Sequence, residues 1–336
     1  MPKPRITIVG LGRIGGSIGL ALKKSKADLE IVGHDKEPRA MQLAQKRGAV
    51  DRTHWNLLSA SDGAGLIVLA LPLGEIQSTL KHLSRELPPG VILTDTAASK
   101  APVLEWAKVL PRDVNFIGGH PIISPRYSPP VTANAPASGP INQPLTGIDA
   151  ADPDLFTNAI YCLTPTPAVE PEAVDVSASF VSMLGAKPLF LDAAEHDGLM
   201  AGAEHLAYIL SATLLHATST SSGWRELSKF AGRAYLDATE LAARDPVSQR
   251  MVMLGQPDDL TRWIDASIET LRELRRAIAQ GDANALDALF QRMNDARKEW
   301  LRGDVGAHAA VDISEVQGGP MRLLLGGLST RGGRRK

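Results

Sequence analysis

The sequence predicts an α/β domain followed by an all-α domain. The chain has 336 residues, and at roughly 100 to 200 residues per domain this length indicates two domains. Residues 5 to 120 alternate short apolar runs with segments of helical pattern, which is typical of a sheet covered by helices. From residue 194 onward, apolar residues recur at helical spacing with few breakers. We therefore predict domains over 1–193 and 194–302 and a flexible tail over 303–336.

Apolar runs in the first domain are its predicted strands, and they cover residues 6–9, 29–33, 66–71, 91–94 and 115–118. None alternates apolar and polar residues, as expected for strands buried on both faces of a parallel sheet. Helical patterns separate them over 16–24, 38–47, 74–83 and 100–110. This order predicts a doubly wound sheet. Two more strands, 160–163 and 189–191, are predicted around a helix over 172–184.

A proline-rich insertion over 124–146 interrupts this order, and we predict a long loop beside the cleft because it follows a strand end. In the second domain, Leu199, Leu206, Leu210 and Leu214 share one helical face, and the run 260–278 repeats this spacing. Such apolar stripes exceed what a small helical domain buries, so we expect a partner surface there. The glycine-rich tail ends in basic residues and is predicted to be solvated.

Composition narrows the class of protein. The formal net charge is −1, so nothing indicates binding to nucleic acid or to an anionic membrane. The longest apolar run, 66–73, is far shorter than the ~20 residues of a membrane helix. The one cysteine, Cys162, cannot form an internal disulfide and is expected to be a buried small hydrophobe. Without a recognisable targeting segment, these features favour the cytoplasm, and no residue spacing indicates a metal site.

A glycine-rich turn follows the first predicted strand. Gly10, Gly12 and Gly15 form a G-x-G-x-x-G pattern that opens a helix. The first glycine permits a tight turn, the second lets the backbone approach a pyrophosphate, and the third lets helix and strand pack closely. The free N–H groups of the helix then face the anion. This pattern predicts a Rossmann-type dinucleotide-binding domain.

A carboxylate stands where the ribose of such a dinucleotide would lie. Asp35 ends the second predicted strand, 20 residues after Gly15, and repels a 2′-phosphate, so we predict NAD as cofactor in preference to NADP. Lys36 and Arg39 follow closely and leave NADP open. The residues predicted to bind the cofactor are Gly10, Leu11, Gly12, Arg13, Ile14, Gly15, Asp35, Lys36, Leu71 and Pro72.

Several short motifs, in order, resemble the prephenate/arogenate dehydrogenases of tyrosine biosynthesis. The glycine turn is followed by T-D-T-A-A-S-K over 94–100, G-G-H-P over 118–121 and E-H-D over 195–197. The resemblance extends over about residues 5 to 300 and implies an all-α dimerisation domain after the Rossmann-type domain. It also implies an NAD-dependent oxidative decarboxylation and a homodimer formed by residues 196 to 300.

The resemblance assigns His120 as the group that accepts the hydroxyl proton of the substrate, a role that suits a histidine near neutral pH. The alternative is a histidine that only caps the turn before Pro121. His196 and Asp197 are expected to order a helix start. Residues that the resemblance places near the substrate are Ser99, Lys100, Arg126, His205, Tyr208 and Glu240.

The substrate pocket departs from the family pattern. Ala98 stands where the family has a serine, and Tyr208 stands where it has a second histidine. Glu240 replaces the arginine that grips a substrate carboxylate, and two carboxylates repel each other. As an alternative, Glu240 forms a surface pair with Arg244.

Several functions therefore stay open. The insertion, through Arg126 for example, could supply new carboxylate contacts for prephenate or arogenate, or the pocket could serve another small molecule. A non-catalytic NAD-binding protein and a two-domain reductase of hydroxy acids or imines are further alternatives. The latter does not explain the G-G-H-P motif over 118–121.

Overall fold

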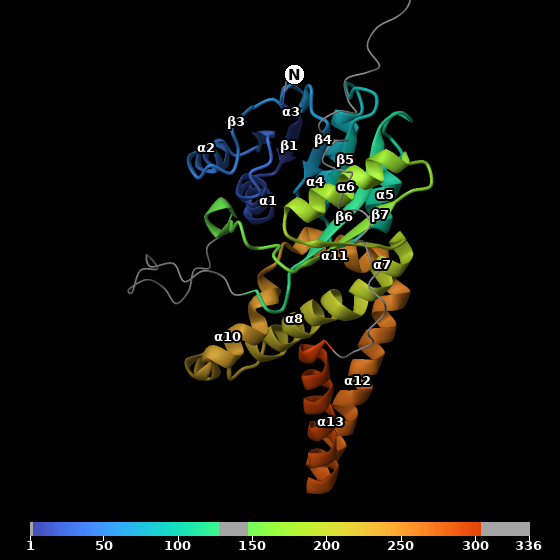
Figure 1. Ribbon diagram of the computed structural model, residues 1–336. Helices are drawn as coiled ribbons and strands as arrows, with labels where there is room; N and C mark the ends of the chain where they lie inside the picture. The colour runs from blue at the N-terminus through green and yellow to red at the C-terminus, as the bar shows by residue number, and fades with distance from the viewer. Residues whose placement is uncertain (1–2, 128–146, 304–336) are drawn as a thin grey trace, which may run out of the picture. The chain divides into compact units, whose positions relative to one another are not determined.

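The computed structural model describes residues 3–127 and 147–303 (Figure 1). The described residues form two compact units. Among the described residues, the first extends to Met200 and also includes Arg244–Gly255, and the second comprises Ala201–Ala243 and residues 256–303. Two units were predicted, but the division falls after residue 200 instead of 193.

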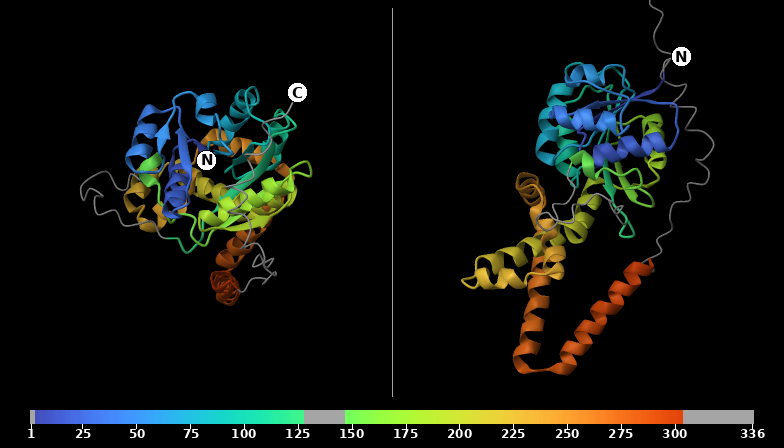
Figure 2. Two further views of the ribbon diagram at one scale, coloured as in Figure 1. Left: turned by 45° about the horizontal axis from the view of Figure 1, so that its top comes forward. Right: turned by 90° about the vertical axis from the view of Figure 1, so that its left-hand side faces the viewer.

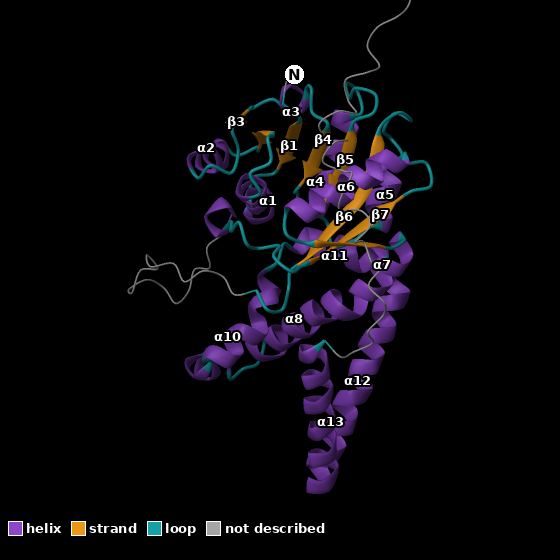
Figure 3. Ribbon diagram, in the orientation of Figure 1, coloured by secondary structure: helices purple, strands orange, loops and turns teal. Residues whose placement is uncertain are grey.

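One mixed sheet forms the centre of the first unit, and Figure 3 shows its strands in orange. The strand order is β3-β2-β1-β4-β5-β6-β7-β8. The first six strands in this order, from β3 across to β6, are all parallel. Strand β7 is antiparallel to β6, and β8 is parallel to β7. The strands are β1 (Arg5–Val9), β2 (Glu30–His34), β3 (Arg52–Thr53), β4 (Leu66–Leu69), β5 (Ile92–Asp95), β6 (Asn115–Ile122), β7 (Ile160–Pro165) and β8 (Lys187–Phe190).

Both faces of this sheet are buried, which explains its uninterrupted apolar strands. In β4, Leu66 and Val68 join one buried cluster, and Ile67 and Leu69 join another on the opposite face. The first cluster includes residues of α1, α2 and α6, and the second includes residues of α4 and α5. The helices of this region are α1 (Arg13–Lys24), α2 (Pro38–Lys46), α3 (Leu57–Ser61), α4 (Leu73–Leu83), α5 (Ala101–Ala107), α6 (Pro171–Met183) and α7 (Ala193–Met200).

Strand β6 differs from its prediction. It was expected to end at 118, with His120 just past it, but it continues to Ile122. The parallel partner β5 reaches only to the pair Thr94–Ile117, whereas β7 pairs with β6 through residue 122. His120 therefore lies inside β6 and beyond the end of its parallel pairing. The short elements β3 and α3 were not predicted, and β8 begins at Lys187 instead of 189.

The second unit consists of helices. A π-helical turn, η2 (Ala201–His205), leads into α8 (Leu206–Ser219), and 3-10 turns η3 (Ser228–Phe230) and η4 (Glu240–Ala243) separate shorter helices. Helices α12 and α13 form a hairpin (Figure 2). Asp258 and Asp259 favour the start of α12 through the helix dipole, and Gly281 ends it in the left-handed conformation. The helices are α9 (Trp224–Leu227), α10 (Arg233–Thr239), α12 (Pro257–Gln280) and α13 (Ala283–Arg302).

Helix α11 (Pro246–Gly255) belongs to the first unit, although it lies within the predicted helical domain. It packs against α4, and its Val252 is buried in the same cluster as residues of α4 and α5. The helical domain is therefore not one continuous stretch of chain.

One helical span among the described residues, Ala193–Ser219, has the length and hydropathy to cross a membrane, on those two criteria alone.

Tyr127, near the start of the predicted insertion, is linked to α1 through Asp152. Tyr127 donates a hydrogen bond to Asp152 Oδ2 over 2.6 Å, and Asp152 N donates to Ser17 Oγ over 2.9 Å. Burial and the neighbouring Asp152 raise the pKa of Tyr127 to about 12, so this hydroxyl stays a donor. Residues 128–146 of the predicted loop lie outside the described residues.

Candidate dinucleotide and catalytic site

The glycine turn between β1 and α1 is built as a dinucleotide cradle requires. Gly10 has a φ of 92°, and a Cβ there would lie 2.3 Å from the Ala70 carbonyl oxygen. A Cβ on Gly15 would lie 1.9 Å from the Gly10 carbonyl oxygen. These two glycines are therefore required by the protein's own packing.

Gly12 is different, because a Cβ there would meet no described atom within 4 Å. Packing among the described residues does not explain a glycine at this position, whereas close approach of a ligand does. Gly12 is the N-cap of α1, which has no side-chain cap and no acidic residue in its first turn. The first N–H groups of α1 are thus suited to a bound phosphate.

Asp35 follows β2 and is fixed beside the glycine turn. Its Oδ2 accepts a hydrogen bond from Leu11 N at 2.7 Å, and its Oδ1 accepts one from Glu37 N at 2.8 Å. Lys36 Nζ lies 2.5 Å from Glu75 Oε1, and this contact raises the pKa of the exposed lysine. The charge of Lys36 therefore has an acidic partner within the protein, which favours NAD over a 2′-phosphorylated dinucleotide.

The other residues predicted to contact the cofactor lie at the same edge of the sheet. Leu71 and Pro72 connect β4 to α4, and Leu71 Cδ2 lies next to Gly10. Arg13 and Ile14 are in the first turn of α1. The structure thus brings the predicted cofactor residues together at the carboxyl ends of β1, β2 and β4, around the switch in strand order at which such folds bind ligands.

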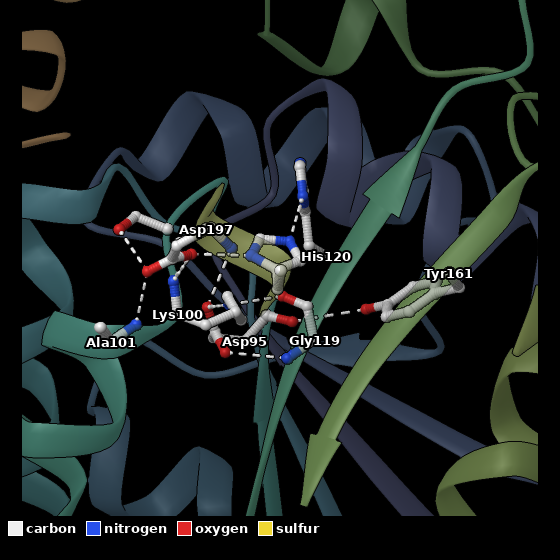
Figure 4. A network of polar contacts seen from close by, with 10 residues as sticks. Asp95, Lys100, Ala101, Gly119, His120, Tyr161 and Asp197 are labelled. Atoms are coloured by element: carbon white, nitrogen blue, oxygen red, sulfur yellow. Dashed lines mark hydrogen bonds and ion pairs between the residues drawn. The ribbon is translucent and has the colours of Figure 1, made fainter. Parts of the chain in front are cut away.

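His120 belongs to a buried chain of polar groups (Figure 4). Its Nδ1 lies 3.0 Å from Nε2 of His196, and the two rings meet edge to face. Nδ1 of His196 lies 2.7 Å from Oδ1 of Asp197. His120 is 6% exposed, while His196 and Asp197 are at most 1% exposed. Strand β6 supplies the first residue, and α7 supplies the other two.

Asp197 also fixes the start of α5. Its Oδ1 accepts from Lys100 N at 2.6 Å, and its Oδ2 accepts from Ala101 N at 2.8 Å and from Ser99 Oγ at 3.3 Å. Burial acts to raise the pKa of Asp197, but the bonds from His196 and the two backbone N–H groups outweigh it and lower the pKa. Asp197 is therefore an anion at neutral pH.

A second buried pair supports the backbone before His120. Lys100 Nζ contacts the Asp95 carboxylate and donates to the Gly119 carbonyl oxygen over 2.6 Å. Asp95 Oδ1 in turn accepts from Gly119 N at 3.0 Å. Burial lowers the pKa of Lys100, although Asp95 opposes this effect. Both backbone groups of Gly119 are thus held by one ion pair (Figure 4).

The predicted substrate residues are divided between the first unit, which holds Ser99, Lys100 and Arg126, and the second unit, which holds His205, Tyr208 and Glu240. Ser99 and Lys100 are fully buried, and we interpret them as support for the site, not as substrate contacts. Arg126 is exposed in the loop after β6. In the second unit, His205 ends η2, and α8, which carries Tyr208, packs against η4, whose first residue is the exposed Glu240.

The connection of His196 and Asp197 to His120 was not predicted from the sequence. The E-H-D motif was visible, and Asp197 does order a helix start, but that helix is α5, almost a hundred residues earlier in the chain.

Among residues 3–127 and 147–303, no group of three or more His, Cys, Asp or Glu side chains is arranged to hold a metal ion.

A doubly wound sheet with a glycine cradle after β1 and a carboxylate after β2 defines a dinucleotide-binding protein. Two family models also match this chain. The nucleotide-binding domain of prephenate dehydrogenase matches residues 18–139, and its dimerization domain matches residues 192–292. Together they cover more than half of the sequence. The chain belongs to the prephenate dehydrogenase family, as its motifs predicted.

Individual relatives agree with this assignment. A prephenate dehydrogenase of Lactococcus lactis is 31% identical over 291 residues, which span 85% of this chain and 75% of that protein. The crystal structure of Synechocystis arogenate dehydrogenase is 27% identical, with a TM-score of 0.65 over 88% of this chain and 99% of that one. Prephenate dehydrogenase from A. aeolicus, at 21% identity, shares the fold with a TM-score of 0.74 over 89% of this chain and 99% of that one. The predicted fold class, a Rossmann-type domain followed by a helical dimerisation domain, is confirmed.

Asp35 provides a test of cofactor choice. Wild-type protein is expected to bind NAD more tightly than NADP, since the Asp35 carboxylate would accept hydrogen bonds from the ribose hydroxyls and would repel a 2′-phosphate. Asp35→Asn keeps one acceptor oxygen but removes the charge, so NAD should bind roughly tenfold more weakly while NADP loses less. Calorimetric titration of both nucleotides measures this, with the exposed Asp62→Asn at the opposite edge of the sheet as control. Tighter binding of NADP by the wild type would contradict the assignment.

Proposed function

We propose that this chain is an NAD-dependent dehydrogenase that oxidatively decarboxylates prephenate or arogenate, with His120 as the proton acceptor. One observation carries the proposal. His120 lies on the same sheet as the glycine cradle and Asp35, at the end where the parallel strands finish. The buried His196–Asp197 pair contacts its ring, and the buried Lys100–Asp95 ion pair holds the backbone of the preceding Gly119. Family membership supplies the reaction class, and the geometry supplies a candidate base.

The residues of the cradle fit a bound NAD. The N–H groups at the start of α1 would hold its pyrophosphate, and Asp35 would hold its adenosine ribose. Bound NAD supplies the acceptor for a hydride. The A. aeolicus relative was solved in complex with NAD+ and hydroxyphenyl propionate, which supports this choice of cofactor for a protein of the same fold.

His120 takes part in the proton transfer. The hydroxyl-bearing ring carbon of the substrate gives up its hydrogen with the electron pair of the C–H bond. His120 accepts the hydroxyl proton, which stabilises the oxygen as the carbonyl character develops. The bond from the ring to the carboxylate breaks, carbon dioxide leaves, and the electron pair of that bond completes the aromatic ring. The oxygen then takes its proton back as a phenol, so His120 is regenerated.

Glu240, in the second unit, favours a second candidate function. The exposed carboxylate of Glu240 stands where family members carry an arginine for a substrate carboxylate. Either other residues, such as Arg126, hold that carboxylate, or the protein oxidises a different small molecule by the same chemistry. The second alternative requires no change in the cofactor cradle or in His120.

Assembly as a homodimer is part of the proposal. The matched domain is named for dimerization, and helices α12 and α13 expose large apolar side chains, among them Leu271, Ile278, Phe290 and Trp300. Large apolar side chains exposed on one pair of helices are typical of interfaces. We propose that they contribute to a largely apolar interface between two copies and that the enzyme works in the cytoplasm.

The first test of the function measures NAD reduction with prephenate and with arogenate. His120→Asn keeps much of the size of the side chain but removes the base, so turnover should fall by about 10²–10⁴-fold. NAD affinity should barely change, because the cradle lies on other strands. The exposed His82→Asn on α4 is the matched control. Wild-type turnover by His120→Asn would end the catalytic assignment, and no turnover of either substrate by the wild type would favour the second candidate.

The second test concerns Glu240. If Glu240 repels the carboxylate of prephenate, Glu240→Arg should raise kcat/KM for it by roughly ten- to a hundredfold, since a charge-assisted pair contributes about 1.5–3 kcal/mol. Glu86→Arg, an exposed charge reversal in the first unit, serves as control. A wild type that is efficient with prephenate and gains nothing from Glu240→Arg would show that other residues replaced the arginine.

The third test concerns assembly. Static light scattering at micromolar concentration should give about twice the chain mass of 35.8 kDa. Replacing Phe290 and Trp300 with glutamate should lower this mass, because charges at an apolar interface lose their hydration. A mass near that of one chain for the wild type would refute the dimer.

A further inference from the structure

We infer that His196 and Asp197 are positioning residues for His120: they hold the His120 proton on Nδ1, so that Nε2 presents the lone pair, and they stabilise the ring after it accepts a proton. The part of this inference that concerns turnover rests on the proposed function. The part that concerns the tautomer rests only on the geometry of the buried chain.

The direction of the hydrogen bonds follows from Asp197. Its carboxylate already accepts from the N–H groups of Lys100 and Ala101, and an ionised carboxylate can only accept. Nδ1 of His196 must therefore donate to Asp197 across the 2.7 Å contact. A neutral His196 then has its lone pair on Nε2, which accepts from Nδ1 of His120 across 3.0 Å. The neutral His120 ring consequently has its lone pair on Nε2.

The chain also stabilises the product of proton transfer. When the O–H bond of a substrate breaks and its proton joins Nε2, His120 has protons on both nitrogens and carries a positive charge. The nearest anion along the chain is Asp197, which is almost fully buried and fixed by two backbone N–H groups. Charges interact more strongly in such an environment than in water. A carboxylate that orients and stabilises a histidine in this way is known from the serine protease triad.

The other titratable groups described on β5 and β7 next to His120 do not supply the same charge. The Asp95 carboxylate on β5 is paired with Lys100, directly before α5. On β7, Cys162 stands opposite His120, and burial raises the pKa of its thiol to about 11. Burial also raises the pKa of Tyr161. Both side chains are therefore neutral over the pH range in which a histidine titrates.

The tautomer can be measured without any substrate. The chain has eight histidines, and all of them can be labelled with ¹⁵N for NMR. Comparison with the spectra of His120→Asn and His196→Leu assigns the signals of the two rings. We expect a protonated Nδ1 and an unprotonated Nε2 for neutral His120 in the full-length wild type. In His196→Leu the Nδ1–H population should fall. A wild-type His120 that carries its proton on Nε2 would overturn the inference.

A pair of variants separates positioning from packing. His196→Leu removes the acceptor for His120, and kcat should fall on the order of 10²-fold or more, with little change in KM or NAD affinity. His196→Gln can donate to Asp197 and accept from His120, so it should recover at least tenfold of that loss. His82→Leu and His82→Gln are the matched controls on α4. Equal activity of His196→Leu and His196→Gln would contradict a role through the hydrogen-bonded chain.

The pH profile tests the charge of Asp197. In Asp197→Asn the anion that stabilises protonated His120 is gone, so the ring stays unprotonated to lower pH. The acid limb of kcat/KM should therefore move to lower pH while the plateau falls. A purely structural role in α5 would lower the plateau and leave the limb in place, and that result would count against the inference. If Asp197→Asn does not fold, the comparison of His196→Leu with His196→Gln still tests whether the hydrogen-bonded chain positions His120.

Failure of this inference and failure of the proposed function give different results. If neither prephenate nor arogenate is oxidised, the proposed function fails, but the NMR measurement still determines the tautomer. If the wild type is active and His120→Asn is inactive while His120 has its proton on Nε2, only the inference fails. An active enzyme with the expected tautomer and recovery in His196→Gln supports both.

Discussion

The buried carboxylate of Asp197 is the constraint on which the geometry of the site depends. A charge with almost no solvent contact is stable only when its lone pairs are satisfied. Asp197 meets this requirement with two backbone N–H groups at the start of α5, the Ser99 hydroxyl and His196. Because these partners come from α5 and α7, one side chain determines where both helices meet and where His196 points.

Strand β6 brings His120 to the same place for a different reason. Its first residues pair in parallel with β5, and its later residues pair in antiparallel fashion with β7. Doubly wound sheets bind ligands at the carboxyl ends of their parallel strands. Strand β6 extends beyond the end of β5 while it remains paired with β7. A histidine in a strand is held more firmly than one in a loop. The ion pair between Lys100 and Asp95 then fixes the residue before it through both backbone groups of Gly119.

Much of the fold could be predicted from the sequence, because apolar runs and glycine patterns depend on local chemistry. The predicted bounds of β1 and β2, which precede the glycine turn and Asp35, differ from the observed bounds by one residue. The glycine turn itself lies where the sequence pattern predicted it. The end of β6 was missed because it depends on β7, a strand about forty residues away. The place of α11 was missed because a helix in a helical stretch gives no sign that its apolar face packs on α4 of the first unit.

The candidate site was predictable where motifs act locally and unpredictable where they act at a distance. His120 was found through G-G-H-P, but its partner His196 is 76 residues away along the chain. The family resemblance of the T-D-T-A-A-S-K motif places Ser99 and Lys100 near the substrate. In the structure both side chains are buried, with Ser99 bonded to Asp197 and Lys100 bonded to Asp95 and the Gly119 carbonyl. Buried ion pairs contribute little net stability, since loss of hydration offsets their attraction. Two such networks beneath one histidine are therefore better explained by the position and charge state that they impose on His120 than by any gain in the free energy of folding.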